Sequence, residues 1–267
     1  MKYIIALDQG TTSSRALLIN EDGKLIDIKQ KEFKQIFPKQ GWVEHDPIEI
    51  LNTQMEVFEE LVSSISLSEI ISIGITNQRE TTVIWDKETG KPLYNAIVWQ
   101  DKRTSGICDQ MKKDGLESYT KENTGLVIDS YFSGTKIKWL IENVEGVKDK
   151  INKNKVLFGT IDTWLIYNLT SFKNHLTDFT NASRTMIYNI KNLEWDKTLL
   201  NYLGIPKSIL PEVVNSSSDF GNFSYKGFEI PIHGVAGDQQ SALFGQACFD
   251  DGMVKNTYGT GCFCIMN

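Results

Sequence analysis

The chain has 267 residues, of which 40% are hydrophobic and 23% charged, and this apolar content is enough for a folded core and excludes a disordered protein. Lys and Arg total 28 against 34 Asp and Glu, and the resulting net charge of -6 argues against a broad nucleic-acid-binding face. No apolar run is long enough to cross a membrane, and four cysteines are too few for a disulfide scaffold, so we expect a soluble, cytoplasmic protein.

The first thirty residues predict a three-stranded antiparallel meander. Strands are expected at residues 3–7, 15–19 and 25–30. A polar loop, residues 8–14, joins the first two strands, and Asp22-Gly23 is the hairpin signal before the third.

A helix is expected to begin directly after Asp46. Asp46 suits the N-cap, Pro47 the first helical position, and Glu49 stands three residues after the cap. The apolar residues that follow at spacings of three and four predict one buried stripe: Ile48, Leu51, Met55, Phe58 and Val62.

The remaining pattern alternates strands with helices, which indicates a mixed α/β domain over residues 1–250. The expected strands are residues 70–76, 81–85, 94–99 and 230–235. The expected helices are residues 102–113, 133–143 and 239–247. In the second of these helices the spacing predicts Ile137, Leu140 and Ile141 inward and Lys136, Lys138 and Glu142 outward.

The final segment repeats the pattern of the opening hairpin. Strands are expected at residues 253–257 and 262–266, joined by a Gly/Thr turn like that around Gly10. Two such hairpins indicate a duplicated α/β domain. We therefore expect residues 251–267 to be the first hairpin of a second domain, cut short at Asn267.

Residues 8–15 are the first candidate binding segment. They combine a carboxylate at a strand end, Asp8, with Gly10, four hydroxyls and Arg15. Such a turn can direct donors at phosphate oxygens while Asp8 holds a hydrated magnesium ion. The alternative is an ordinary hairpin with exposed Ser and Thr. Neither a Walker A loop nor a G-x-G-x-x-G dinucleotide motif is present.

Two further positions carry charges that suit a polyol site. Asp238 stands where a strand passes into a helix, and there a carboxylate can stay ionised and deprotonate a hydroxyl, or it can be a plain N-cap. Arg79 and Glu80, between two predicted strands, can bracket adjacent hydroxyls or form an exposed ion pair.

Three aromatic residues lie beside polar residues at the ends of predicted elements: Trp99, Tyr131 and Phe263. Sugar and polyol sites use aromatic rings to cover C–H groups. Packing in the core is the alternative for each of them.

Six strings in fixed order carry a family resemblance: DQGTTSSR (8–15), GWVEHDP (41–47), NQRETT (77–82), YFSGTK (131–136), GDQQ (237–240) and YGTGCF (258–263). Together they resemble the FGGY carbohydrate-kinase family over essentially the whole chain. Arg79, Glu80 and Trp99 resemble the members that phosphorylate glycerol rather than those that act on pentuloses.

The resemblance implies an actin-like ATPase fold of the ribonuclease-H type, with a mixed sheet flanked by helices and two duplicated domains around an active-site cleft. It also implies transfer of the ATP γ-phosphoryl group to glycerol, giving sn-glycerol 3-phosphate, with Mg²⁺ as cofactor. The second domain would bind the nucleotide, and the full-length protein would form a homo-oligomer.

The resemblance also assigns roles to residues, with Asp238 as the catalytic base. The residues that would hold the hydroxyls of glycerol are Arg79, Glu80, Tyr131, Asp238 and Gln239. Its carbon edge would be covered by Trp99 and Phe263. The nucleotide phosphates would meet Thr11, Thr12, Ser13, Arg15 and Thr260, and Asp8 would lie by the magnesium ion.

Family members run to about twice this length, so we expect the isolated chain to be inactive because most of the second domain is absent. Two alternatives stay open. One is a kinase of the same family for another polyol or ketose. The other is a non-catalytic, actin-like sensor of a nucleotide or polyol.

Overall fold

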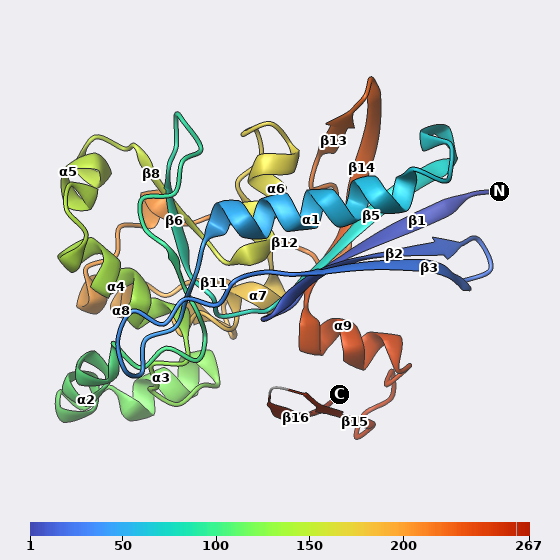
Figure 1. Ribbon diagram of the computed structural model, residues 1–267. Helices are drawn as coiled ribbons and strands as arrows, with labels where there is room; N and C mark the ends of the chain where they lie inside the picture. Colours follow the sequence, from blue (N-terminus) through green and yellow to red (C-terminus); the bar gives the residue numbers. More distant parts are fainter. Residues whose placement is uncertain (260) are drawn as a thin grey trace.

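The computed structural model describes residues 1–259 and 261–267, which form a mixed α/β structure (Figure 1). A six-stranded sheet has the order β13-β14-β5-β1-β2-β3. Its strands are β1 (Tyr3–Gln9), β2 (Ser13–Asn20), β3 (Leu25–Glu32), β5 (Ile70–Asn77), β13 (Asn222–Tyr225) and β14 (Phe228–Gly237).

The predicted meander is confirmed, because β2 pairs antiparallel with both β1 and β3. The predicted seven-residue polar loop is shorter than expected. Asp8 pairs with Arg15 and Gln9 with Ser14 in the β-ladder, so only residues 10–12 remain as the turn. On the other side of β1 the pairing is parallel: β1 pairs with β5, and β5 pairs with β14.

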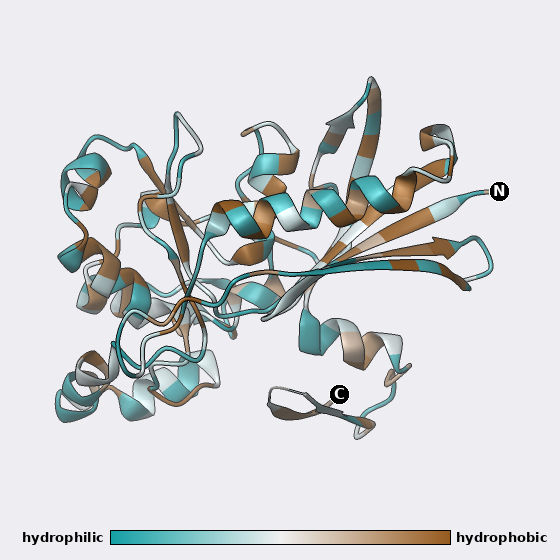
Figure 2. Cartoon of the chain, in the orientation of Figure 1, coloured by the Kyte–Doolittle hydropathy of each residue, from teal (hydrophilic) through white to brown (hydrophobic). Residues whose placement is uncertain are grey.

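Helix α1 (Pro47–Val62) begins where predicted, and the Asp46 carboxylate accepts a hydrogen bond from the Ile48 amide. The predicted stripe is partly wrong, because Ile48 is 40% exposed, and the buried face is centred on Ile50 and Val57. That buried face also includes Gln54, whose side chain donates to the Arg15 carbonyl. Because a polar residue stands on the buried face, the spacing of apolar residues alone does not identify that face. Figure 2 shows hydrophobic and hydrophilic patches alternating along this helix.

The other described helices are α2 (Ser105–Lys113), α3 (Glu117–Thr124), α4 (Ser133–Asn143), α5 (Val147–Asn152), α6 (Ile161–Leu169), α7 (Phe179–Ala182), α8 (Lys197–Leu203) and α9 (Asp238–Gly245), with short 3₁₀ turns at Leu67–Glu69 and Lys207–Ile209. Helices α2, α3, α4, α5 and α8 lie on the left of Figure 1, beside the sheet, whereas α9 lies below the sheet. None of the described helices is long and apolar enough to cross a membrane.

Short strands complete the described part of the chain: β4 (Glu44–His45), β6 (Val83–Asp86), β7 (Ala96–Ile97), β8 (Val156–Gly159), β9 (Leu176–Asp178), β10 (Tyr188–Asn189), β11 (Glu194–Trp195), β12 (Glu212–Val214), β15 (Val254–Tyr258) and β16 (Cys262–Met266). The strand predicted over residues 94–99 is therefore reduced to two residues. The final antiparallel hairpin, β15–β16, is confirmed as a hairpin.

Two hydrophobic clusters meet at the β6–β8 pair. Trp85 and Leu157 belong to the cluster under the main sheet, whereas their neighbours Ile84 and Phe158 belong to the cluster among the helices. Because successive side chains of a strand point to opposite faces, the β6–β8 pair contributes residues to both clusters. This packing ties the helical region to the sheet that carries the site.

Lys136 corrects the prediction for helix α4. Ile137 and Leu140 are buried as expected, but Lys136 is fully buried instead of facing solvent. Its Nζ donates to the carbonyl oxygens of Tyr131, at 2.5 Å, and Phe132, at 3.4 Å. Burial lowers the pKa of Lys136 to about 7. The outward prediction was wrong because the first turns of α4 are enclosed on all sides.

Candidate active site

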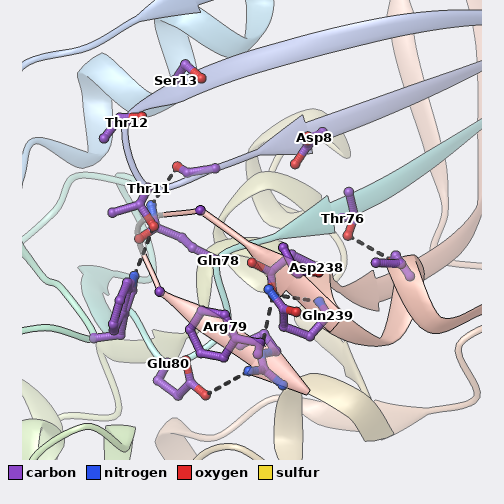
Figure 3. Close-up of a pocket in the computed structure, with 18 of the residues that line it drawn as sticks. Asp8, Thr11, Thr12, Ser13, Thr76, Gln78, Arg79, Glu80, Asp238 and Gln239 are labelled. Carbon is purple, nitrogen blue, oxygen red and sulfur yellow. Dashed lines mark hydrogen bonds and ion pairs between the residues drawn. The ribbon is translucent and has the colours of Figure 1, made fainter. Parts of the chain in front are cut away.

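A cavity of about 450 Å³ opens where β1, β5 and β14 end together (Figure 3). The parallel register aligns Gln9 with Asn77 and Asn77 with Gly237, so the segments that follow these residues emerge side by side. Ligands of α/β sheets commonly bind at such carboxyl ends. The lining residues are Asp8, Gly10, Thr11, Thr12, Ser13, Arg15, Thr76, Gln78, Arg79, Glu80, Trp99, Tyr131, Asp238, Gln239, Ser241, Ala242, Thr257, Gly259, Gly261 and Phe263.

A cluster of charges occupies one end of this cavity. Arg79 Nε lies 3.4 Å from Asp238 Oδ1, and Arg79 Nη2 lies 3.8 Å from Glu80 Oε1. Arg184 Nε donates to the same Glu80 oxygen at 2.7 Å. The side chains of Arg79 and Glu80 are only 4% and 2% exposed, so they do not form the exposed ion pair considered as an alternative. A buried carboxylate held between two guanidinium groups makes a fixed polar wall.

Asp238 is the first residue of α9, and Gly237 takes the N-cap position, so the plain N-cap alternative is wrong. Its carboxylate accepts from the Gln239 amide at 2.7 Å, and its side chain is 36% exposed to the cavity. Burial raises the pKa of Asp238, while the Arg79 guanidinium opposes that rise. A carboxylate with a raised pKa is a better proton acceptor than an ordinary one.

The stem of Arg79 lies directly against Gly237. A Cβ atom at residue 237 would stand 2.6 Å from both Cγ and Cδ of Arg79. The guanidinium is fixed further along by Gln240, whose Oε1 accepts from Arg79 Nη1 at 3.1 Å. Glycine is therefore required at residue 237 for Arg79 to reach Asp238.

The β1–β2 turn forms the other end of the cavity. Arg15 Nη1 donates to Asp8 Oδ2 at 2.9 Å. Burial raises the pKa of Asp8, and Arg15 opposes the rise. The Thr11 hydroxyl accepts from the Trp99 indole N–H at 2.9 Å, and the Ser13 hydroxyl from Gln30 at 3.3 Å.

The donor set at this turn suits a magnesium ion carried by a phosphate. Among residues 1–259 and 261–267, no three His, Cys, Asp or Glu side chains gather into a site made of protein ligands alone. Magnesium is usually bound through one or two carboxylates together with substrate phosphates and water. Asp8, the one carboxylate beside the turn hydroxyls, fits that requirement.

The three predicted aromatic residues come together at the cavity wall. The Trp99 ring lies 5.4 Å from Tyr131 and 6.1 Å from Phe263, measured between ring centroids. Tyr131 comes from the residues before α4, and Phe263 from β16. The rings therefore form an apolar face beside the charged cluster, and they line the cavity instead of being enclosed in the core.

Gln239 also lines the cavity, and it contacts the last hairpin. Lys255 Nζ donates to Gln239 Oε1 and, at 2.7 Å, to the Thr257 hydroxyl. The predicted phosphate ligand Thr260 lies outside the described residues. All the other predicted site residues border this one cavity.

Two residues that hold the site in place, Gln78 and Arg184, were not among the predicted site residues. Gln78 is buried, and its Nε2 donates to Gln9 Oε1 and to the Gly10 carbonyl, both at 3.0 Å, which fixes the phosphate-side turn. Its place beside Arg79 was the available signal. Arg184 stands 104 residues from its partner Glu80, so no local pattern pairs them.

We predict that Gly237→Ala disturbs the charged cluster. The added methyl group would overlap Arg79, so the Arg79–Asp238 contact should lengthen and the free energy of unfolding should fall by about 1–3 kcal/mol. Gly234→Ala in the same strand is the control, because its Cβ meets nothing closer than 3.9 Å. Urea unfolding and a crystal structure of each variant measure the effect. Equal stability of the two variants would contradict this packing.

Comparisons with known proteins identify the family of the chain. The family model "FGGY family of carbohydrate kinases, N-terminal domain" matches residues 3–245. The glycerol kinase of Alkaliphilus metalliredigens is 61% identical over 271 residues, and that of Fusobacterium nucleatum is 62% identical over 273. All of this chain is covered, but only 54% and 55% of those relatives. The chain thus spans about half the length of the curated relatives it matches.

The fold of the chain is also similar to the folds of solved carbohydrate-kinase structures. Plasmodium falciparum glycerol kinase with ADP superimposes with a TM-score of 0.95 at 40% identity, covering 100% of this chain and 54% of that one. A ligand-bound xylulose kinase from Lactobacillus acidophilus gives 0.86 at 25%, covering 98% and 53%. The expected actin-like ATPase fold is confirmed. The chain therefore belongs to the FGGY family of carbohydrate kinases.

Proposed function

We propose that this chain forms the N-terminal half of a glycerol kinase, which transfers the γ-phosphoryl group of ATP to glycerol and gives sn-glycerol 3-phosphate. One observation supports this most strongly. Asp238, Arg79 and Glu80 share one cavity with three aromatic rings and with the hydroxyl-rich turn after β1. The relatives at about 60% identity bear the name glycerol kinase.

The charged end of the cavity suits a three-carbon triol. Arg79 can donate to hydroxyl oxygens, while Glu80 and Asp238 can accept from hydroxyl hydrogens. Tyr131 and Gln239 would supply further polar contacts, and Trp99 and Phe263 would cover the carbon edge. Because Glu80 is held by Arg79 and Arg184, its carboxylate would bind without rearranging.

Asp238 would act as the base in the transfer. A terminal hydroxyl of glycerol gives its proton to the Asp238 carboxylate as its oxygen bonds to the γ-phosphorus. The bond from that phosphorus to the β–γ bridging oxygen breaks, and ADP leaves with the electron pair. The raised pKa of Asp238 fits this proton transfer.

The turn between β1 and β2 would hold the transferred phosphate. Thr11, Thr12, Ser13 and Arg15 would donate to phosphate oxygens, and Thr260 would add a contact from the last hairpin. Asp8 would hold the magnesium ion, which supplies charge neutralisation at the phosphates when bound. Residues 1–250 would form the first FGGY domain, and residues 251–267 the opening hairpin of the nucleotide-binding domain.

A second candidate is a kinase for another sugar or polyol of the same family. The Lactobacillus acidophilus neighbours, named xylulose kinase and gluconate kinase, match the fold with TM-scores of 0.86. A hybrid protein decides between these substrates: residues 1–267 of this chain continued by the C-terminal half of the Fusobacterium nucleatum relative. Its kcat/KM values for glycerol, xylulose and gluconate rank the three directly, and we expect glycerol to rank first.

We predict that the isolated 267-residue chain produces glycerol 3-phosphate from ATP and glycerol only at background rate. Half of the relatives' length has no counterpart in it, and closure around the substrate excludes water in kinases. A coupled assay for glycerol 3-phosphate, with the hybrid protein as positive control, makes the measurement. Appreciable product from the isolated chain would refute this expectation.

We predict that Asp238→Asn in the hybrid protein lowers kcat by about 10²–10⁴-fold, because the amide cannot accept the hydroxyl proton. The dissociation constant for glycerol, from calorimetry, should change little because Arg79 and Glu80 remain. Asp109→Asn on the exposed face of α2 is the control and should leave both values unchanged. Undiminished turnover in Asp238→Asn would remove this residue from the chemistry. A wild-type hybrid that binds without turnover would favour the sensor alternative.

A further inference from the structure

The backbone just before Asp238 is held by a side chain. Gly237 is the last residue of β14 in register with β5, and its N–H donates to the Thr180 hydroxyl at 2.8 Å. Thr180 belongs to α7, which lies more than fifty residues earlier in the sequence. The direction in which Asp238 leaves the sheet therefore depends on a contact from a separate element.

The Thr180 hydroxyl has a fixed orientation. It donates to Asp178 Oδ2 at 2.7 Å, and the same oxygen accepts from the Thr180 amide at 3.0 Å and the Ser216 hydroxyl at 2.7 Å. Because the hydroxyl hydrogen is directed at the carboxylate, a lone pair is left for the Gly237 N–H. A buried carboxylate, Asp178, thus acts on Gly237 through one hydroxyl.

The same carboxylate also holds the segment before Arg79. Asp178 Oδ1 accepts from the amide and the side chain of Asn181, at 3.0 and 2.9 Å. Asn181 and Asn77 exchange two side-chain hydrogen bonds, at 3.0 and 3.2 Å. Asp178 is therefore linked to both chain segments that supply the charged cluster, although it does not line the cavity itself.

The need for such a contact follows from Gly237. Glycine is required there because a Cβ would overlap Arg79, and glycine is also the residue with the greatest backbone freedom. A hydrogen bond to its N–H fixes the plane of the Ala236–Gly237 peptide, and so limits the rotation about Gly237 that sets the direction of Asp238. The Thr180 hydroxyl supplies that restriction where the β-ladder ends.

We propose that Thr180, oriented by Asp178, is a positioning residue that fixes Asp238 toward the attacking hydroxyl of the substrate. This inference rests on the proposed kinase function for its catalytic consequence. The hydrogen bond to Gly237 itself can be tested without any activity.

The experiment compares three variants. Thr180→Val keeps the shape but removes the hydroxyl, and Thr180→Ser keeps the hydroxyl. Thr170→Val is the matched control, because the Thr170 hydroxyl also donates, to the Ile166 carbonyl at 2.8 Å and the Tyr167 carbonyl at 3.5 Å, and accepts from the Asn174 amide, at a buried place away from the cavity. Amide hydrogen exchange at Gly237 is measured in the 267-residue chain, and kcat and both KM values in the hybrid protein.

We expect Thr180→Val to speed exchange at Gly237 and to lower kcat, by up to about 10²-fold, with the KM for ATP unchanged. Thr180→Ser and Thr170→Val should match the wild type in both readouts. Normal exchange at Gly237 in Thr180→Val would overturn the proposed contact. Faster exchange with normal kcat would overturn the positioning role. An inactive wild-type hybrid would instead refute the proposed function, while the exchange data would still decide on the contact.

Discussion

The register of three parallel strands determines where the chemistry of this protein is placed. Strands β1, β5 and β14 end at paired residues, Gln9, Asn77 and Gly237, so three separate polar segments leave one sheet edge together. A shift of one residue in either pairing would send alternate side chains to the opposite face. The buried residues on these strands, such as Ile5 and Ile73, resist such a shift because they pack in the core.

Burial of charge is the second constraint on the site. Glu80 is nearly inaccessible, and an unpaired carboxylate there would be strongly unfavourable. Arg79 and Arg184 compensate that charge, and Arg79 in turn lies beside Asp238. Because such pairs contribute little net stability, their value lies in a fixed geometry. The proposed binding of a polyol would use this geometry without rearranging the cluster.

Much of this arrangement could be predicted from local sequence. The opening meander, the start of α1, and the last hairpin follow from turn residues and caps that act over a few positions. Helix α6 was missed because nearly all of its residues are buried, which leaves no amphipathic period to detect. Short strands such as β10 and β11 depend on tertiary pairing and give no signal of their own.

The site residues also fall into those that local sequence identifies and those that depend on contacts between distant segments. Motif strings identified Asp8, Arg79, Glu80 and Asp238, and the structure brings these residues to one cavity. Supporting groups could not be found in this way, because Arg184 and the Asp178–Thr180 pair act on residues far away in the sequence. Lys136 reads as a surface lysine by its spacing and is buried only because of what packs around α4.

The most direct test of the account is a crystal structure of the hybrid protein with glycerol and a non-hydrolysable ATP analogue. We predict a terminal hydroxyl of glycerol at hydrogen-bond distance, about 2.6–3.2 Å, from the Asp238 carboxylate, with the other hydroxyls on Arg79 and Glu80. Glycerol bound elsewhere, or bound in this cavity with its hydroxyls turned away from Asp238, would contradict the account.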